Sequence, residues 1–376
     1  MDVVGRGGQD PLNYVLVQAL MDAGTCIWIG YIAQHIQKEM FIPAALLAAF
    51  NPTQIVVAGM VYADTPFLFF VAAGFGLSVG WLKDPSFRFT MGIGGAWGLA
   101  IMTRPFVQYW LYLLPIFLFI FSFILYRAGS VRRLVQIMMM TVLVVAITMP
   151  MALRNFDQFN TYRLSAQSGS HFLFWITPLV REFKDGTPRA VSKARSDQLY
   201  ESWQSTPPPT DPFMSSDRMM AIAKQELWDM GPAAVASAWA KGSIMNLFAP
   251  ASTIAMPVVS LPRTSFYDTP GVDLEDKVWN YLFNNEGGTY KAILLVSGAA
   301  MPFWVVLGIA GIFIGLHRQP KAALPVLLLV LWAGFTLMLN GPVVSPKYRL
   351  PMEPAWMIFA SLSLSSLWHK ITALKN

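Results

Sequence analysis

The chain has few charged residues for its length. Asp, Glu, Lys and Arg make up 13% of its 376 residues, whereas soluble domains contain about 25%. Hydrophobic residues make up 55%, and the mean hydropathy is +0.47. These values exclude an ordinary soluble domain and predict extensive contact with lipid. In a soluble protein the net charge of +6 would suggest nucleic acid. Here we expect the basic residues to set membrane topology, with no nucleic acid bound.

Cysteine and histidine are scarce as well. Cys26 is the only cysteine, which excludes an intrachain disulfide and a metal site built from several cysteines. His171 is the only histidine in the long polar stretch between residues 155 and 290. It could act as a general base, although a lone histidine is more often a surface residue with satisfied hydrogen bonds. The sequence leaves both interpretations open.

What the chain does contain is a series of apolar runs separated by short polar turns. A bilayer core requires about 20 mostly apolar residues per helix, because backbone groups in lipid must pair within their own segment. The third, fourth and ninth of the nine runs are shorter than a full crossing. The runs are Asn13–Gln34, Phe41–Gly59, Thr65–Trp81, Phe89–Met102, Val107–Tyr126, Val131–Met151, Ala292–Leu316, Ala322–Leu339 and Ala355–Leu367.

This pattern predicts an all-α fold, a polytopic transmembrane helix bundle with a helical insertion on the outer side of the membrane. We expect an N-terminal transmembrane bundle (1–154), an extracytoplasmic insertion (155–290) and C-terminal transmembrane helices (291–376). Cytoplasmic loops carry an excess of Lys and Arg, and the turns around Lys38, Lys83 and Arg132 fit that rule if the spans alternate strictly. The insertion, with 11 Lys and Arg against 14 Asp and Glu, has a net charge of −3, and the other residues carry +9.

Five charged residues stand at the predicted outer ends of apolar runs. Asp64 is a candidate metal ligand, because a carboxylate suits a divalent cation. Arg104 is a candidate for binding a lipid-linked phosphate, since a guanidinium can bind two phosphate oxygens at once. Arg154, Lys347 and Arg349 are candidates for the same role. Two structural alternatives stay open: an ion pair between Asp64 and Arg104, and anchoring of Lys347 among lipid headgroups.

Three features inside the apolar runs predict local structure. Asp22 lies within the first run, where an unpaired carboxylate is costly, so we expect it to face other helices or water. Gly94 and Gly98 are spaced for close helix packing, and no strand precedes them to favour a dinucleotide site. Asn51-Pro52 predicts a kink in the second run.

The insertion is predicted to contain two consecutive helices. Ser216 can cap the first, which Gly231-Pro232 ends, and the second covers Ala233–Phe248. Ala223 and Met230 fall on one apolar face of the first helix. This face could pack on the insertion's own small core or against the membrane, and the sequence favours neither.

Short motifs along most of the chain resemble the bacterial GT-C glycosyltransferases, which include protein mannosyltransferases and aminoarabinose transferases. Each motif is weak alone, but their order and spacing follow the pattern of that superfamily. The motifs are Gln18-Ala-Leu, Ala48-Ala-Phe-Asn-Pro52, Asp64-Thr, Gly98-Leu-Ala-Ile-Met-Thr-Arg104-Pro105, Pro150-Met-Ala-Leu-Arg154-Asn155 and Tyr348-Arg349-Leu-Pro351-Met-Glu353-Pro354.

The resemblance implies a multi-pass protein of the bacterial inner membrane with its large loop outside the cytoplasm. Such a protein moves a sugar, with inversion, from a polyprenyl-phosphate donor to a lipid, glycan or protein acceptor. The resemblance also implies a catalytic aspartate in an outer loop that we expect upstream of Met1, so we expect a truncated sequence or a misassigned start. Asp64 stands where the family usually has Glu and stays a candidate for acceptor activation or for a divalent metal, the only cofactor expected.

Two other classes of function compete with a glycosyltransferase. A transporter usually places ionisable groups near the midplane of repeated, broken helices, whereas here Asp22 alone does so and no repeat is apparent. A catalytically inactive membrane scaffold is the third interpretation. Sugar transfer by the purified protein would separate the enzyme from both.

Overall fold

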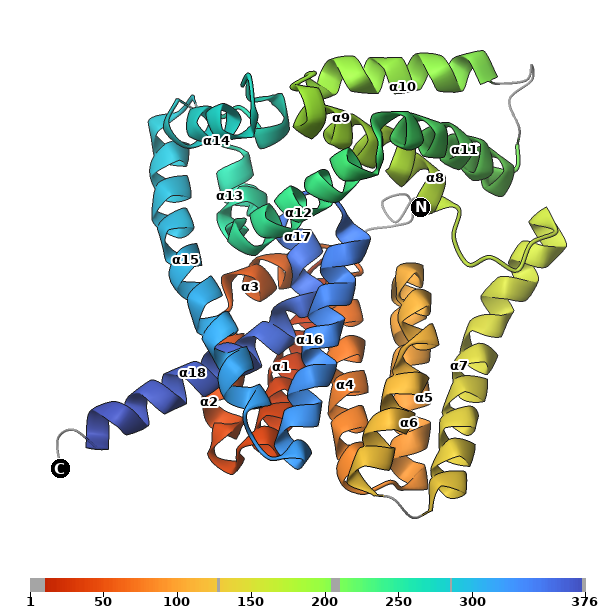
Figure 1. Ribbon diagram of the computed structural model, residues 1–376, viewed down its shortest axis with the longest axis vertical. Helices are drawn as coiled ribbons and strands as arrows, with labels where there is room; N and C mark the ends of the chain where they lie inside the picture. The colour runs from red at the N-terminus through yellow and green to blue at the C-terminus, as the bar shows by residue number, and fades with distance from the viewer. Residues whose placement is uncertain (1–10, 127–128, 204–209, 285, 374–376) are drawn as a thin grey trace. The chain divides into compact units, whose positions relative to one another are not determined.

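The computed structural model describes residues 11–126, 129–203, 210–284 and 286–373, which form helices and no strand (Figure 1). This confirms the predicted all-α class. The first helices are α1 (Pro11–Ile36), η1 (Lys38–Met40), α2 (Phe41–Ala49), α3 (Pro52–Ala58), α4 (Asp64–Lys83), α5 (Phe87–Thr103), η2 (Pro105–Tyr112), α6 (Leu114–Leu125) and α7 (Ser130–Phe159). Next come α8 (Gln167–His171), η3 (Phe172–Ile176), α9 (Thr177–Asp185), α10 (Arg189–Trp203), α11 (Pro212–Met230), α12 (Pro232–Phe248), η4 (Ala251–Ile254), α13 (Met256–Val259), η5 (Phe266–Asp268) and α14 (Leu274–Phe283). The last are α15 (Gly288–Leu316), α16 (Pro320–Asn340), α17 (Pro346–Arg349), η6 (Leu350–Met352) and α18 (Glu353–Ala373).

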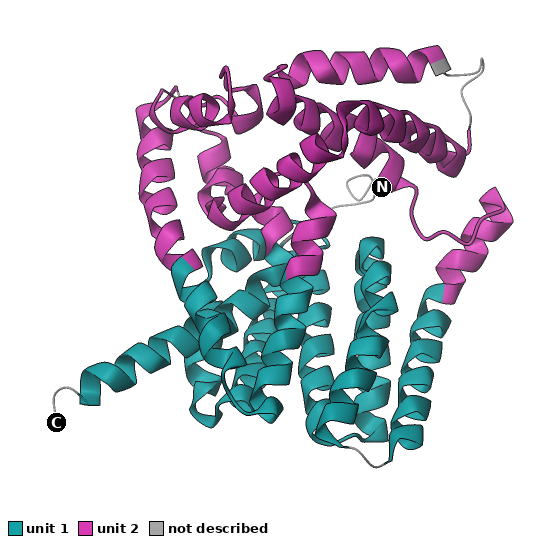
Figure 2. Cartoon of the chain, in the orientation of Figure 1, with its two compact units in different colours: residues 1–148, 306–333, 350–376 teal, residues 149–305, 334–349 magenta. Residues whose placement is uncertain are grey.

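These helices form two compact units (Figure 2). Unit 1 comprises residues 1–148, 306–333 and 350–376, and unit 2 comprises residues 149–305 and 334–349. Three of the four boundaries fall inside the long helices α7, α15 and α16, so each of these contributes to both units, and the fourth lies between α17 and η6. The predicted three-part division at residues 154 and 290 stays a prediction.

Within the described residues, six helical segments are long and apolar enough to cross a bilayer, which indicates a multi-pass membrane protein. They are Leu12–Ile36, Asp64–Lys83, Pro105–Leu125, Ser130–Phe159, Gly288–Leu316 and Pro320–Asn340. The predicted runs Phe89–Met102 and Ala355–Leu367 lie in α5 and α18, outside this set. With 17 residues, α5 is about 26 Å long, short of a bilayer core of about 30 Å. The first half of α18 is buried on all sides, as in a helix inside a bundle.

The predicted kink at Asn51-Pro52 is confirmed. The segments Lys38–Ala49 and Pro52–Ala58 meet at an angle of 56°. Proline cannot continue the preceding helix, and the Asn51 side chain starts α3 by accepting hydrogen bonds from the backbone N–H groups of Thr53 and Gln54. The break thus combines a helix stop and a helix cap in two adjacent residues.

A buried carboxylate of unit 1 holds this break in place. Glu353, at the first position of α18, is 1% exposed and accepts hydrogen bonds from Asn51 Nδ2 (2.9 Å) and Thr53 Oγ1 (3.3 Å). Replacing Glu353 by Ala should lower the free energy of unfolding by about 2–4 kcal/mol, because it leaves buried donors without their charged acceptor. Thermal unfolding of the purified protein measures the loss. The exposed Glu39→Ala serves as control, and equal melting temperatures for the two variants would contradict this role.

Glycines bring helices of unit 1 into close contact. A Cβ atom at Gly94 would lie 2.9 Å from the backbone oxygen of Met140, and one at Gly98 would lie 2.8 Å from the Ile147 side chain. The predicted packing role of Gly94 and Gly98 is therefore confirmed, and α7 is the helix that they meet.

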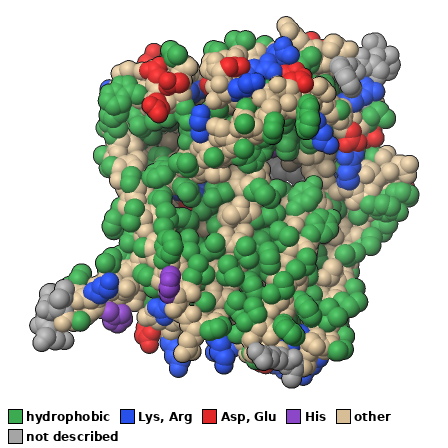
Figure 3. All heavy atoms as spheres, in the orientation of Figure 1, with side chains coloured by type: hydrophobic (Ala, Val, Ile, Leu, Met, Phe, Trp, Pro, Cys, Tyr) green, Lys and Arg blue, Asp and Glu red, His purple; other side chains and the backbone are tan. Residues whose placement is uncertain are grey.

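Turns with basic residues gather at shared ends of the unit 1 helices. The Arg318 side chain donates to Gln37 Oε1 at 2.6 Å, which joins the turn after α15 to the turn after α1. The Arg133 side chain donates to the backbone of Tyr126, and Tyr126 donates to the backbone of Lys83. Figure 3 shows Lys and Arg side chains at the ends of these helices and hydrophobic side chains along them. The hydrogen bonds of Tyr126 and Arg133 thus join the turns around Lys83 and Arg132, which the charge rule places on one side.

Unit 2 has small apolar cores of its own. Met230 packs with Leu179, Val180 and Ala238, and Ala223 packs with Leu173 and Ile222. Of the two open interpretations of this α11 face, packing within the insertion is therefore the one observed for Ala223 and Met230.

The predicted start of the first insertion helix is wrong. α11 begins at Pro212 rather than Ser216, because the Asp211 side chain caps it by accepting from the Phe213 N–H at 2.8 Å. Ser216 is buried within the helix, where its hydroxyl accepts from the Gly169 N–H at 3.0 Å. The predicted end at Gly231-Pro232 and the second helix, α12, are confirmed.

An ion cluster joins α9, α10 and α11 in unit 2. Glu226 is 8% exposed, pairs with Arg181, and accepts from Arg195 at 3.1 and 3.0 Å. Burial favours the neutral acid, but the hydrogen bonds and charges of Arg195 and Arg181 outweigh it and hold the pKa of Glu226 below its ordinary value. A depressed carboxyl pKa stabilises the fold above the pKa of the unfolded chain, about 4.3, and this stabilisation is lost as the pH falls through the folded pKa.

Glu226→Gln should therefore lower the melting temperature at pH 7 by about 2–4 °C. The difference from the native chain should shrink as the pH falls below about 4, because the native carboxylate is then protonated as well. Melting curves between pH 3 and pH 7 measure it. Asp197→Asn, which removes an exposed pair with Lys193, is the control and should change little. A difference that is the same at every pH would rule out ionisation of Glu226 as its cause.

Candidate functional site

Asp64 and Arg104 meet in unit 1. Asp64 begins α4, Arg104 directly follows α5, and an Arg104 Nη2–Asp64 Oδ1 ion pair joins them. The Asp64 side chain is 3% exposed and the Arg104 side chain 26%. The carboxylate is thus shielded while the guanidinium is partly accessible, so Asp64 orients Arg104 and Arg104 is the member of the pair that can meet a phosphate. The ion pair between Asp64 and Arg104, which the sequence left open as a structural alternative, is therefore present.

Arg349 has a structural role in unit 2. It is 6% exposed, and its Nη1 donates to the carbonyl oxygens of Leu247 (3.0 Å) and Ala249 (2.9 Å) at the C-terminal end of α12. A cation at this end complements the helix dipole and satisfies carbonyls that have no partner within the helix. Its predicted contact with phosphate stays a prediction.

Arg154 lies on an exposed part of α7 in unit 2. Its guanidinium donates to Asn155 Oδ1 at 3.3 and 2.9 Å, and Asn155 Nδ2 donates to the backbone of Arg163 at 2.7 Å. Asp64 and Arg104 belong to unit 1, whereas Arg154, Lys347 and Arg349 belong to unit 2. A common site for all five residues therefore stays a prediction.

Lys347 lines a cavity of about 660 Å³ within unit 2. Cavities of this size hold small ligands, and their walls are usually apolar with a few placed polar groups. The second cation in the lining is Arg263, whose Nε donates to the Val259 carbonyl oxygen and whose guanidinium lies 5.6 Å from the centre of the Tyr290 ring. The apolar and aromatic walls include Trp175, Phe248, Phe266, Tyr281, Leu282 and Leu294.

The segment that carries Lys347 is fixed by hydrogen bonds to its neighbours. Asn246 of α12 is fully buried, donates to the Val343 carbonyl oxygen at 2.8 Å and accepts from the Ser345 N–H at 2.9 Å. The Tyr267 hydroxyl donates to the Val344 carbonyl oxygen at 2.7 Å and accepts from the Val344 N–H at 3.0 Å. These bonds hold the cavity wall in one conformation, which limits the cost of ordering it around a ligand.

Tyr267 is both a wall of the cavity and a support for it. Burial raises its pKa to about 12, so the phenol stays neutral at physiological pH and keeps donating to Val344. On α10, Arg189 lies between the rings of Trp175 and Tyr267, 4.4 and 4.7 Å from their centres. A cation stacked on two aromatic rings stiffens this side of the cavity.

His171 lies beside aromatic rings in unit 2. Its imidazole is 6.4 Å from the Tyr348 ring and 6.5 Å from the Phe172 ring, measured between ring centres. Burial lowers the pKa of His171, so the neutral form that a general base requires is favoured at pH 7. Its exposure is intermediate, and both interpretations, a general base and a surface histidine with satisfied hydrogen bonds, stay open.

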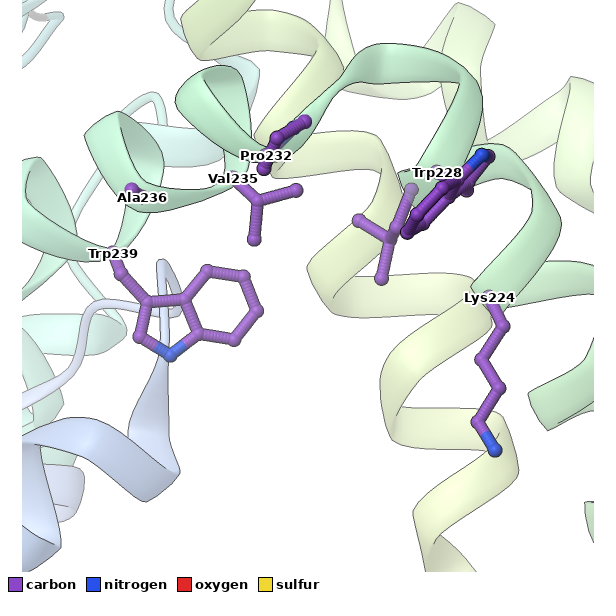
Figure 4. Close-up of a pocket in the computed structure, with 7 residues that line it drawn as sticks. Lys224, Trp228, Pro232, Val235, Ala236 and Trp239 are labelled. Carbon is purple, nitrogen blue, oxygen red and sulfur yellow. The ribbon is translucent and has the colours of Figure 1, made fainter.

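A shallower hollow lies between α11 and α12 (Figure 4). Trp228 and Lys224 flank it on α11, and Val235 and Trp239 flank it on α12. Lys224 is the charged residue of its lining, and Trp228 is 80% exposed. This hollow is open and nearly apolar, with no group placed for chemistry, so the larger cavity beside Lys347 is the better candidate site.

A divalent metal at Asp64 has little support from the residues around it. Within the described ranges no group of three or more His, Cys, Asp and Glu side chains comes together. A divalent cation is usually bound by several oxygen ligands, and Asp64 supplies one carboxylate that already pairs with Arg104. We therefore derive no chemical step through a metal.

Sequence reasoning missed Arg263 and Tyr267. A local signal exists, because Leu261-Pro-Arg263 follows an apolar segment and precedes the aromatic pair Phe266-Tyr267. A lone cation beside aromatic residues is typical of an interface between apolar and polar surroundings.

The chain matches no protein-family model, and no match is found among curated proteins.

Proposed function

We propose that the chain is a membrane glycosyltransferase that takes a sugar from a polyprenyl-phosphate donor. The acceptor is a lipid, glycan or protein on the extracytoplasmic face of the bacterial inner membrane, where residues 155–290 form the large periplasmic loop. The proposal is supported by the resemblance of the motifs to the GT-C superfamily and by the six apolar helices. In this assignment Lys347 binds the donor phosphate in the cavity of unit 2, and Arg104, Arg154 and Arg349 remain individual candidates for contact with phosphate.

The cavity beside Lys347 is the observation that carries the proposal. A polyprenyl phosphate combines an apolar chain with an anionic headgroup, and the cavity combines apolar walls with the cations Lys347 and Arg263. A Lys ammonium binds phosphate as a point charge, whereas Arg binds it through a planar fork. Partial exclusion of water strengthens both interactions.

The reaction requires one bond to form and one to break. A hydroxyl or amine of the acceptor attacks the anomeric carbon, the bond from that carbon to the phosphate oxygen breaks, and polyprenyl phosphate leaves with the electron pair. The proton of the acceptor passes to a carboxylate base, which the resemblance assigns to an aspartate. Cationic side chains lower the barrier by stabilising the charge that develops on the leaving phosphate.

Binding of the donor and transfer of the sugar are best measured separately. Purified protein in lipid nanodiscs is incubated with polyprenyl phosphate, and the bound fraction is measured by native mass spectrometry. Transfer is then followed with polyprenyl phosphates that carry radiolabelled sugars and with a mixture of envelope acceptors. Specific binding together with transfer supports the proposal. Binding no tighter than that of an equally long polyprenol without phosphate would refute it.

A transporter is the second candidate, because unit 1 places polar groups at a broken helix. Asp22 lies within a membrane-spanning helix and contacts Gln54 just after the break, and Glu353 is buried at the same break. Ionisable groups at interrupted helices are typical of transport pathways. Proteoliposomes that contain the protein would take up a transported substrate without changing it chemically. Such uptake would favour a transporter over the transferase.

A further inference from the structure

Two polar residues share one face of α1 in the middle of a membrane-spanning helix. Gln18 and Asp22 are four residues apart, so their side chains are neighbours on the helix surface. The span covers Leu12–Ile36, and Asp22 lies near its centre. An ionised carboxylate at this depth is costly unless a partner balances its charge or water reaches it.

Two buried amides accompany this carboxylate. Gln54 of α3 donates from Nε2 to Asp22 Oδ1 at 3.2 Å, and Gln18 donates from Nε2 to the Tyr62 carbonyl oxygen at 2.6 Å. Gln18 and Gln54 are each 1% exposed. Both amides therefore use an N–H group locally, and their carbonyl oxygens remain available.

Those carbonyl oxygens are the unexplained feature of the cluster. Gln18 Oε1 and Gln54 Oε1 are buried and accept no hydrogen bond from any residue of the described ranges. Buried carbonyl groups almost always have a partner, because leaving one unsatisfied costs the full loss of its hydration. The ion pairs formed by the described residues do not include Asp22. Asp22 thus has an amide donor but no cation among the described ion pairs, and the two buried amide oxygens on α1 and α3 have no donor.

We propose that Gln18, Asp22 and Gln54 form a binding site for a monovalent metal cation, Na⁺ in the first instance. Carboxylate and amide oxygens are hard ligands, which suit alkali and alkaline-earth ions rather than soft metals. One carboxylate and one monovalent ion give a neutral site, whereas a divalent ion would leave a net charge within the span. The proposal does not depend on sugar transfer.

The surrounding backbone favours this assignment. Gln54 lies in the first turn of α3, directly after the 56° break, and Tyr62 lies in the irregular segment between α3 and α4. Interrupted helices with unwound carbonyls recur where membrane proteins bind Na⁺. The bent chain here brings Gln54 against α1, so the site connects α1 to the segment that follows the break.

Thermal unfolding of the full chain in detergent tests the proposal. NaCl replaces choline chloride at constant ionic strength, so that screening is unchanged. Saturating Na⁺ should raise the melting temperature by roughly 2 °C, because a ligand that binds only the folded state stabilises it. Asp22→Asn and Gln54→Met should each abolish this rise or shift its midpoint at least tenfold. Asp84→Asn, in an exposed turn, should retain it.

The outcomes are distinct even if Asp22→Asn fails to fold, since Gln54→Met keeps the carboxylate and the native chain is informative alone. Equal melting temperatures of the native chain in Na⁺, K⁺ and choline would overturn the proposal. So would stabilisation by Mg²⁺ alone, because it contradicts the charge argument, or a Na⁺ effect that persists unchanged in Gln54→Met. Loss of polyprenyl-phosphate binding leaves these readouts unaffected, so this test and the test of the transferase can fail independently.

Discussion

Replacing Lys347 and Arg263 together by Ala should raise the dissociation constant for polyprenyl phosphate about 100-fold. A hydrogen bond to a charged group contributes about 1.5–3 kcal/mol, and each 1.4 kcal/mol is a factor of ten in affinity. Each single variant should lose about tenfold. The apolar walls of the cavity are unchanged, so binding of a polyprenol without phosphate should stay as it is in the native chain.

Charge-conserving variants and a remote control separate binding from folding in this experiment. Lys347→Arg keeps the cation and should retain most of the affinity, whereas Lys347→Gln should lose as much as Lys347→Ala. Lys224→Ala changes a lysine at the open hollow between α11 and α12 and should have no effect. Native-like affinity in the double variant would remove the cavity from the donor site. An equal loss of binding for the polyprenol would show that the walls had collapsed.

Much of the fold follows from where charge is missing. An apolar run of about 20 residues allows few structures in lipid, so the helical class and most of the spans were predictable. The break at Asn51-Pro52 was predictable too, since proline stops one helix and asparagine caps the next. The start of α11 was not, because Asp211 and Ser216 are both good caps and the choice depends on the contact of Ser216 with Gly169.

The candidate site was predictable only in part. Asp64 and Arg104 pair because antiparallel α4 and α5 bring the start of one to the end of the other, a relation that alternation of spans already implies. Arginine is the residue type expected at a phosphate. The Arg349 guanidinium instead donates to the carbonyl oxygen of Ala249 at the end of α12, 100 residues earlier in the chain. The cavity depends on side chains from several helices, and no single segment carries its pattern.

Replacing Gly311 by Ala should destabilise unit 1 more than the same replacement at Gly308 or Gly95. A Cβ atom at Gly311 of α15 would lie 1.8 Å from the backbone oxygen of Phe359 in α18 and 2.4 Å from its carbonyl carbon. Backbone atoms of a buried helix cannot move aside as a side-chain tip can. The two helices must separate, which costs about 3 kcal/mol or more, the upper end of the range for overpacked cores.

The other two glycines make the comparison quantitative. A Cβ at Gly308 would lie 2.2 Å from the indole of Trp356, a side chain that can partly rotate away, so Gly308→Ala should cost less. A Cβ at Gly95 of α5 has no neighbour within 4 Å, and Gly95→Ala should be neutral or stabilising by up to about 1 kcal/mol through helix propensity. Melting temperatures in detergent should therefore rank Gly95→Ala highest, Gly308→Ala next and Gly311→Ala lowest. If Gly311→Ala and Gly95→Ala have the same melting temperature, then α15 and α18 are not in close contact at Gly308 and Gly311. The close packing described for the first half of α18 would then be contradicted.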